Sequence, residues 1–298
     1  MNRVAVAVFA LGGLAAFAGE AKVSHPFLCA DMGLGKVLQV GADGKVEWEF
    51  PAQVSMDVWR LPNGNVLFSH SRGAKEVTQD KKVVWEYKAE GQVEIFSCQP
   101  LPNGNVLVGE GGPCRLVEVD REGKIQKEIK METKIKGAHG QIRVCRKTPA
   151  GTYLAAFVGE GQVREYSTEG QLIRTIKAPG NPFAAVRLPD GNTLIACGDG
   201  HKLIEVDPKD NVVWQINEND LPDNPLRFVA GVQRLPNGNT VVANWLGHGN
   251  FVGKQPQIFE VTRDKQVVWQ VFDPQFRLIT NIYLLDVPGD PTKGEILR

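Results

Sequence analysis

Apolar and polar residues alternate in short runs along the chain, and turn sequences separate these runs. The turn Leu61-Pro62-Asn63-Gly64-Asn65 stands between two such runs. Asn-Gly and Asp-Gly between apolar runs are strong hairpin signals, because both residues tolerate the positive φ of a tight turn. The same turn recurs at 101–105, 188–192 and 235–239 and, with a looser match, at 148–152. We therefore predict a repeated β-hairpin over the whole chain.

A second alternating hairpin interleaves with the first, and its spacing is constant. One copy begins at Lys36, turns after Val40 and continues through Trp48. The end of its first strand and its tryptophan position are eight residues apart in all six copies: Val40/Trp48, Val77/Trp85, Val119/Lys127, Tyr166/Arg174, Val206/Trp214 and Val261/Trp269. The mean repeat of about 44 residues is the length of one four-stranded propeller blade. We expect the recurrent tryptophans to pack between blades.

The period predicts one all-β domain over residues 25–298, a six-bladed β-propeller of four-stranded antiparallel blades. The first repeat has no proline-glycine turn upstream, so it lacks an inner strand. We expect residues 281–286, near the C-terminus, to supply that strand. The ring would then be closed by N- and C-terminal strands that share one blade, which removes free sheet edges.

Loop lengths predict where a ligand would bind. Both kinds of turn lie on one face of such a propeller, and the remaining connections lie on the other face. Three of those connections are long: Met131–Ile142, Asn217–Val229 and the insertion Asn244–Phe251. Since loops carry most binding residues, we expect the ligand at the mouth of the central pore on this face.

The candidate ligand-binding residues come mostly from these loops. Trp245, His248, Phe228 and Arg227 offer aromatic faces, an imidazole and a cation, which suit an anionic or sugar-like ligand. The alternative is an ordered loop that packs its tryptophan on the blade. The remaining candidates are His139, which could instead cap its loop; Arg143, which could instead pair with Glu94 or Asp57; Asp57 itself; and His70 and Arg72, which could be solvated rim residues.

Charge and the N-terminal sequence limit partners and location. The 298 residues include 34 basic and 34 acidic ones, so no basic stripe indicates nucleic acid. Arg3, the apolar run 4–14 and Ala16-Phe17-Ala18 are typical of a signal peptide, predicted at 1–18; a buried first helix is the alternative. We therefore expect a periplasmic or extracellular protein with no transmembrane segment after cleavage.

The sequence contains no recognised catalytic, metal or cofactor motif. G-x-S-x-G, H-E-x-x-H and EF-hand patterns are all absent, and none of the five cysteines forms C-x-x-C. We therefore expect no metal and no cofactor. Cys98 and Cys145 occupy equivalent positions in neighbouring repeats, so they are either buried thiols or a disulfide.

Two family resemblances follow from the repeat. The pattern in Val206–Gln215 resembles the quinoprotein (PQQ-like) propeller repeat, whose dehydrogenases generally have eight blades and bind calcium, neither of which this sequence indicates. Val83-Val84-Trp85-Glu86-Tyr87 together with Leu-Pro-Asn-Gly-Asn resembles bacterial arylsulfotransferases. In those enzymes a His-Asp pair precedes the turn, but the matching positions in this chain are Met56-Asp57, Phe96-Ser97 and Ala230-Gly231. A family of exported propellers of unassigned function fits best.

Three functional hypotheses remain open from the sequence. The first is a non-enzymatic, exported propeller that binds a small molecule, a carbohydrate or a protein at its loop-rich face. The second is a transferase or lyase of the arylsulfotransferase-like type, in which His139 or His248 acts and Arg143 or Arg227 holds an anion. The third is a scaffold subunit of a cell-envelope assembly, which exposed apolar patches on the blade sides would favour.

Overall fold

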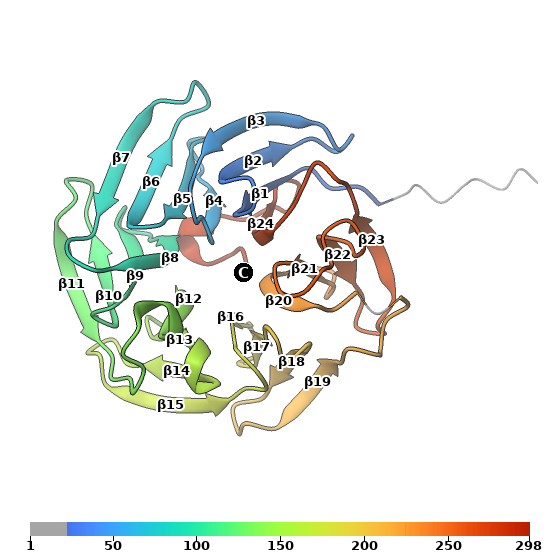
Figure 1. The fold of residues 1–298 in the computed structure, drawn as a ribbon. Helices are drawn as coiled ribbons and strands as arrows, with labels where there is room; N and C mark the ends of the chain where they lie inside the picture. The colour runs from blue at the N-terminus through green and yellow to red at the C-terminus, as the bar shows by residue number, and fades with distance from the viewer. Residues whose placement is uncertain (1–22, 224) are drawn as a thin grey trace, which may run out of the picture.

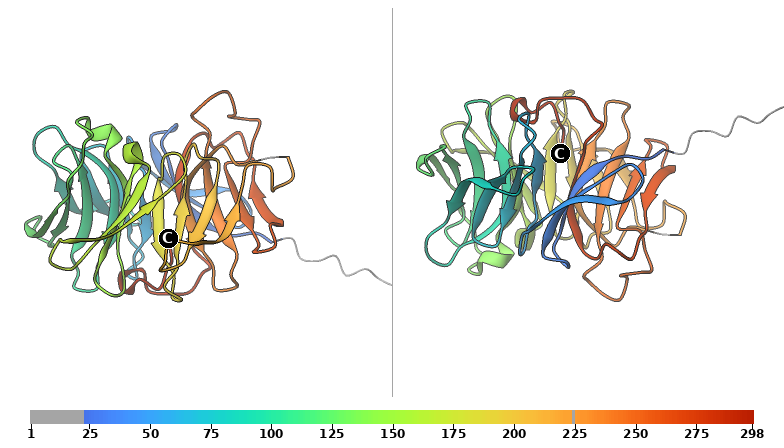
Figure 2. Two further views of the ribbon diagram at one scale, coloured as in Figure 1. Left: turned by 90° about the horizontal axis from the view of Figure 1, so that it is seen from below. Right: turned by 90° about the horizontal axis from the view of Figure 1, so that it is seen from above.

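The computed structural model describes residues 23–223 and 225–298, which form six four-stranded antiparallel sheets around a central axis (Figure 1). The predicted signal peptide lies outside the described residues. Seen from the side, the strands run between two faces that carry the connections (Figure 2). The six-bladed β-propeller predicted from the repeat is therefore confirmed. Among the described residues, no helix is long and apolar enough to span a membrane.

In every blade the first strand lies next to the pore and the fourth lies at the rim of the ring. From the pore outwards, blade one contains β24 (Ile279–Leu284), β1 (Phe27–Asp31), β2 (Lys36–Val40) and β3 (Val46–Pro51); blade two contains β4 (Val58–Arg60), β5 (Val66–His70), β6 (Gly73–Val77) and β7 (Val83–Lys88); blade three contains β8 (Glu94–Pro100), β9 (Val106–Gly111), β10 (Arg115–Val119) and β11 (Ile125–Lys130). Blade four contains β12 (Ile142–Lys147), β13 (Tyr153–Phe157), β14 (Gln162–Tyr166) and β15 (Leu172–Lys177); blade five contains β16 (Ala184–Arg187), β17 (Thr193–Ala196), β18 (Leu203–Val206) and β19 (Val212–Ile216); blade six contains β20 (Phe228–Arg234), β21 (Thr240–Trp245), β22 (Ile258–Val261) and β23 (Val267–Val271). Three short 3-10 helices lie between strands or after the last one: η1 (Ala138–Gly140), η2 (Val158–Glu160) and η3 (Pro291–Lys293).

The third and fourth strands of each blade form the hairpin with the constant eight-residue spacing. That spacing corresponds to one strand register, which is repeated in all six blades. The last residue of the third strand always pairs with the first residue of the fourth, as Val40 does with Val46, and a register shift always precedes that pair. The same pair and the same shift recur in the other blades: Val77/Val83, Val119/Ile125, Tyr166/Leu172, Val206/Val212 and Val261/Val267.

In the turn between the first and second strands of a blade, only one of the two residues that tolerate a positive φ adopts it. The amide of Gly64 donates to the carbonyl of Leu61, and the amide of Leu61 donates to the carbonyl of Asn65. Pro62 and Asn63 are therefore the central residues of a β-turn, and only Gly64, with φ of 82°, is left-handed. This arrangement is the longer hairpin loop that ends in a glycine bulge, and proline at its first central position favours it.

Tryptophans join neighbouring blades, as predicted. The indole N–H of Trp48 donates to the carbonyl of Gln79 in blade two at 3.0 Å, and Trp85 does the same to Asp120 in blade three at 2.9 Å. Trp214 donates to the carbonyl of Arg263 at 2.8 Å. Each bond joins an outer strand to the outer turn of the next blade, so the tryptophans fix the angle between blades.

A glutamate on the third strand of most blades adds a second link, which the repeat pattern did not reveal. Glu205 accepts hydrogen bonds from Asn192 in its own inner turn and from Arg234 in blade six, both at 2.9 Å. It is almost completely buried, so these charge-assisted bonds compensate its lost hydration. Equivalent bonds to the next blade join Glu76 to Arg121, Glu118 to Lys147, Glu165 to Arg187 and Glu260 to His25.

The ring closes as predicted, by pairing β24 with β1. Phe27 pairs with Leu284 and Cys29 with Ile282 in an antiparallel register. His25 strengthens this closure, because its Nδ1 lies 2.7 Å from Asp286 and its Nε2 lies 2.9 Å from Glu260. The C-terminal end of the chain then enters the centre of the ring (Figure 1).

Candidate functional site

A cavity of about 420 Å³ occupies the pore mouth on the face opposite the proline-glycine turns. Its wall comes from the long connections predicted to bind a ligand, from the first residues of the inner strands, and from the shorter connections inside blades one, four and five. Arg143 belongs to β12 and Phe228 to β20, while His139 belongs to η1. The lining residues are Met32, Val54, Met56, His139, Gly140, Arg143, Val158, Gly159, Asn181, Phe183, Asp199, Phe228, Trp245, His248 and Thr280.

Arg143 is a buried cation without a carboxylate partner in the described part of the chain. Its side chain stacks over Phe96, with 4.4 Å between the guanidinium carbon and the ring centroid, and one of its nitrogens donates to the carbonyl of Ile142 at 3.0 Å. Only 6 % of the residue is exposed. Burial lowers the pKa of its guanidinium to about 10, while the charge of Glu94 acts in the opposite direction. The alternative left open by the sequence, an ion pair of Arg143 with Glu94 or Asp57, does not form among the described residues.

His248 lies at the cavity rim within an aromatic group. Its Nδ1 is 2.7 Å from a carboxylate oxygen of Asp199, which leaves Nε2 without a bond to any described residue. The imidazole contacts the rings of Trp245 and Phe228 edge to face, at 4.8 and 5.4 Å between centroids. The insertion in blade six supplies Trp245 and His248, and these meet Asp199 from blade five and Phe228 from the beginning of β20 at one wall.

His139 lies across the cavity mouth in η1. Its Nδ1 is 3.1 Å from Glu94, and its ring contacts Phe96 edge to face at 5.7 Å. Its side chain is 72 % exposed. His139 therefore lines the cavity while it is bonded to β8 of blade three, and it does not cap η1.

A second cavity of about 890 Å³ adjoins the first and shares Val54 and His139 with it. It lies between the connections of blades two, three and four. Its wall includes Arg72, which donates to the carbonyl of Gly91. The other lining residues are Ser71, Gly91, Gln92, Val93, Glu94, Phe96, Gly112, Lys136, Gly137 and Ala138.

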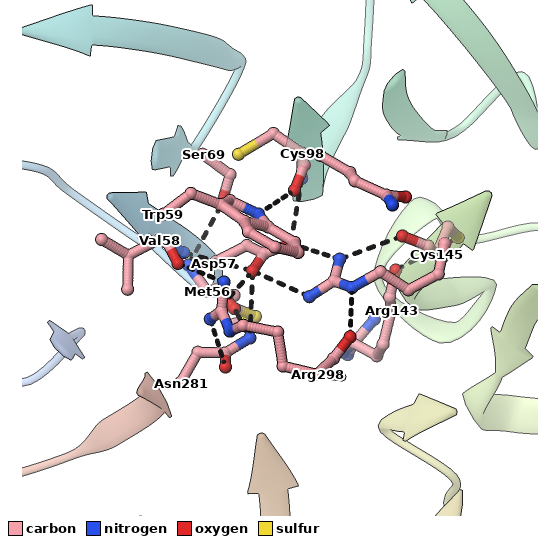
Figure 3. A network of polar contacts seen from close by, with 12 residues as sticks. Met56, Asp57, Val58, Trp59, Ser69, Cys98, Arg143, Cys145, Asn281 and Arg298 are labelled. Atoms are coloured by element: carbon pink, nitrogen blue, oxygen red, sulfur yellow. Dashed lines mark hydrogen bonds and ion pairs between the residues drawn. The ribbon is translucent and has the colours of Figure 1, made fainter. Parts of the chain in front are cut away.

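Asp57 is placed deeper in the channel and does not line the pore-mouth cavity. Its two oxygens accept bonds from Arg146 at 2.6 and 3.0 Å, and Asn281 donates to it at 3.2 Å. Arg298 lies 3.4 Å from it and stacks on Trp59 (Figure 3). Asp57 is fully buried, and its carboxylate holds Arg146 and Asn281 in the interior of the ring.

Arg227 and His70 also lie outside the pore-mouth cavity. Arg227 pairs with Glu218 at 3.1 Å and stacks over Phe251 at 4.6 Å, so it stabilises its own loop. His70 is 3.9 Å from Glu86, and burial, followed by the charge of Lys75, lowers its pKa.

Several lining residues were not predicted from the sequence. Thr280 is near the beginning of β24, and Met56 and Phe183 come just before β4 and β16. Their position along the chain could have identified them, since the beginnings of all inner strands lie at the same mouth of the central pore. Asn181 and Met32 carry no such signal.

The structure leaves all five cysteines unpaired and buried, including Cys98 and Cys145. Burial raises the pKa of the Cys145 thiol to about 12, so it is protonated and unreactive at neutral pH. Within residues 23–223 and 225–298, no group of three or more metal-ligating side chains is present.

Comparison with solved structures places the fold among known six-bladed propellers. A protein of unknown function from Bacteroides caccae is 32 % identical, with a TM-score of 0.82, over 89 % of this chain and 100 % of that one. A streptogramin B lyase is 13 % identical, with a TM-score of 0.61, over 94 % of this chain and 95 % of that one. A catalytically inactive virginiamycin B lyase from Staphylococcus aureus with quinupristin has the same identity and TM-score, over 93 % and 95 %. At that identity the lyases show a shared fold only, and no curated protein matches the chain.

The family model that matches is neither the quinoprotein nor the arylsulfotransferase one, so those two resemblances hold at the level of the propeller repeat. It covers residues 35–266 and is described as Mal s 1 allergenic protein-like. The chain therefore belongs to the Mal s 1 allergenic protein-like family of β-propellers.

Proposed function

We propose that this protein is exported and binds a small molecule with an anionic group in its pore-mouth cavity, without changing it chemically. The signal-like N-terminal sequence supports export. The size of the cavity, about 420 Å³, falls in the range of small-molecule sites. Aromatic and apolar walls from Phe183, Phe228 and Trp245 suit an apolar or aromatic body on the ligand.

The observation that carries this proposal is the unneutralised guanidinium of Arg143. One backbone carbonyl and one ring replace little of the hydration that a buried cation loses. A carboxylate, sulfonate or phosphate in the cavity would provide charge-assisted bonds, and arginine can form two of them in parallel. His139 and His248, on opposite sides of the mouth, add donors or acceptors around such an anion.

Isothermal titration with matched aryl probes tests this function. Benzoate, benzenesulfonate and phenyl phosphate are compared with the neutral benzamide. We expect at least one anion to bind about tenfold or more tightly than benzamide, because a hydrogen bond to a charged group contributes about 1.5–3 kcal/mol. Arg143→Met should remove this preference and Arg143→Lys should keep part of it.

Arg277→Met is the matched control, since Arg277 is exposed on the same face and lines neither cavity. Equal binding of benzamide and all three anions would reject the proposal. So would an anion preference that survives Arg143→Met.

A second candidate function, catalysis by a pore-mouth histidine, is favoured by the His248–Asp199 pair. A histidine oriented through Nδ1 by a carboxylate has Nε2 available as a base. Two of the proteins that share this fold are named lyases. Mass spectrometry of a bound anion after incubation separates the two functions: an altered ligand with wild type, and an unaltered one with His248→Gln, would establish catalysis.

A scaffold role would use the outer strands rather than the cavity. These strands expose apolar pairs, including Val83-Val84, Leu172-Ile173 and Val212-Val213. Size-exclusion chromatography with light scattering tests this candidate, because association through the blade sides predicts a species larger than one chain.

A further inference from the structure

The adjoining cavity carries positive charge that no described residue neutralises. Arg72 and Lys136 line it and neither forms an ion pair, whereas its one carboxylate, Glu94, is already bonded to His139 at 3.1 Å. The described arginines without an ion pair are Arg60, Arg72, Arg143 and Arg277, and all others are paired with a carboxylate. Two of these four line the two cavities.

The two cavities are neighbours with a shared wall. Val54 and His139 contribute to both, and Phe96, which lines the second cavity, lies under the guanidinium of Arg143, which lines the first. A ligand anchored at Arg143 can therefore extend past His139 toward Arg72 and Lys136 without leaving the surface of the protein.

Glycines allow the connections around the second cavity to approach each other closely on its blade-three side. A Cβ at Gly112 would lie 2.4 Å from the carbonyl oxygen of Gln92, and one at Gly111 would lie 2.9 Å from that of Ala138. The connections of blades two to four thus approach each other through bare backbone, and the space between them is lined by Ser71, Gln92 and the two cations. This lining is more polar than that of the pore mouth, although Val54, Val93 and Phe96 also contribute to it.

We propose that the second cavity is a second anion subsite, and that the ligand class is an elongated molecule with an anionic group at each end and an apolar segment between. This inference rests on the proposed function, since Arg143 provides the first subsite. One anionic end meets Arg143, and the other meets Arg72 and Lys136 beyond His139. A monoanion of the same length satisfies only one of the two subsites.

Linear α,ω-dicarboxylic acids of increasing length test the proposal, each compared by titration calorimetry with the monocarboxylic acid of the same carbon number. We expect one length at which the diacid binds about tenfold more tightly than its monoacid, from one additional charge-assisted contact. Arg72→Met combined with Lys136→Met should remove this advantage and leave monoacid affinity unchanged. Arg277→Met with Lys254→Met changes the net charge equally at exposed positions of the same face and should preserve the advantage.

The outcomes separate the two proposals. If monoacids bind through Arg143 but diacids bind no better at any length, the second subsite is overturned and the proposed function stands. If the diacid advantage survives in Arg72→Met/Lys136→Met, the second subsite is also overturned. If neither series binds and the aryl anions fail as well, the proposed function itself is overturned.

Discussion

Three arginine side chains of the channel differ in what neutralises them. Arg146 and Arg298 share the carboxylate of Asp57, and both stack on Trp59, at 4.9 and 4.3 Å from the ring centroid. Arg143 has only the ring of Phe96 and a backbone carbonyl. The first two are therefore neutralised within the protein, and the third is the cation for which we propose a ligand.

Asp57→Asn should strongly destabilise the protein, because it leaves Arg146 and Arg298 buried beside a neutral side chain. Removing one partner of a buried ion pair costs about 3–5 kcal/mol. Urea unfolding followed by fluorescence measures this loss, with the exposed Asp43→Asn as control. A free energy of unfolding equal to that of the control would contradict the structural role of Asp57.

At the level of single residues, the sequence allowed only part of the site to be predicted. His139, Arg143, Phe228, Trp245 and His248 line one cavity, as their loops suggested, whereas Asp57, Arg227 and His70 do not. The reason is geometric, because a polar residue near the pore can bond to protein or face the ligand, and partners distant in sequence decide which. Asn281 and Arg298, which bind Asp57, are more than 200 residues away from it.

At the level of elements, the spacing of the repeat specifies the hairpins. Register shifts within the strands decide in which direction the side chains of the site point. The register of β12 with β13 shifts between Ile142 and Cys145, so Arg143 lies in a bulge. Similar shifts occur near the beginning of β8 and β20. Bulges re-aim side chains, and alternation of apolar and polar residues does not predict them. The sequence therefore locates the strand beginnings without giving the direction of their side chains.

The bonds that glutamates form between neighbouring blades lead to a prediction at the level of elements. Glu205→Gln should reduce the free energy of unfolding by about 1–3 kcal/mol, because bonds to Arg234 and Arg263 lose their charge assistance. Blade one shows that the amide is tolerated at this position, since Gln39 there accepts a bond from Arg60. Chemical unfolding of Glu205→Gln beside the exposed Glu122→Gln provides the measurement, and equal midpoints would refute the link.

At the level of the whole molecule, the pairing of β24 with β1 closes the ring, and both ends of the chain take part in it. We call this pairing and the contacts of His25 the seam. Constant spacing together with a missing inner strand in the first repeat was enough to predict that closure. The contacts that stabilise the seam could not be predicted, since His25, Glu260 and Asp286 are brought together only when the ring has formed.

His25 makes the stability of this seam depend on pH. The hydrogen bond to Glu260 is the main cause that raises the pKa of His25, burial opposes it, and Asp286 adds to the increase. A raised folded-state pKa means that the stabilisation is complete below the unfolded value, about 6.5, and is lost as pH rises through the folded value. The difference in melting temperature between wild type and His25→Gln should therefore be larger near pH 5.5 than near pH 9. These pH values, about 5.5 and 9, lie below and above the unfolded-state pKa of histidine. A constant difference would contradict this role.

The binding of an anion by Arg143 is tested most directly by a crystal structure of the protein with 4-iodobenzoate, in which anomalous scattering locates the iodine. We predict a carboxylate within hydrogen-bond distance of the Arg143 guanidinium and an iodine peak among Phe183, Phe228 and Trp245. Iodobenzoate bound only at exposed cations such as Arg277, with the pore mouth free of it, would contradict the account.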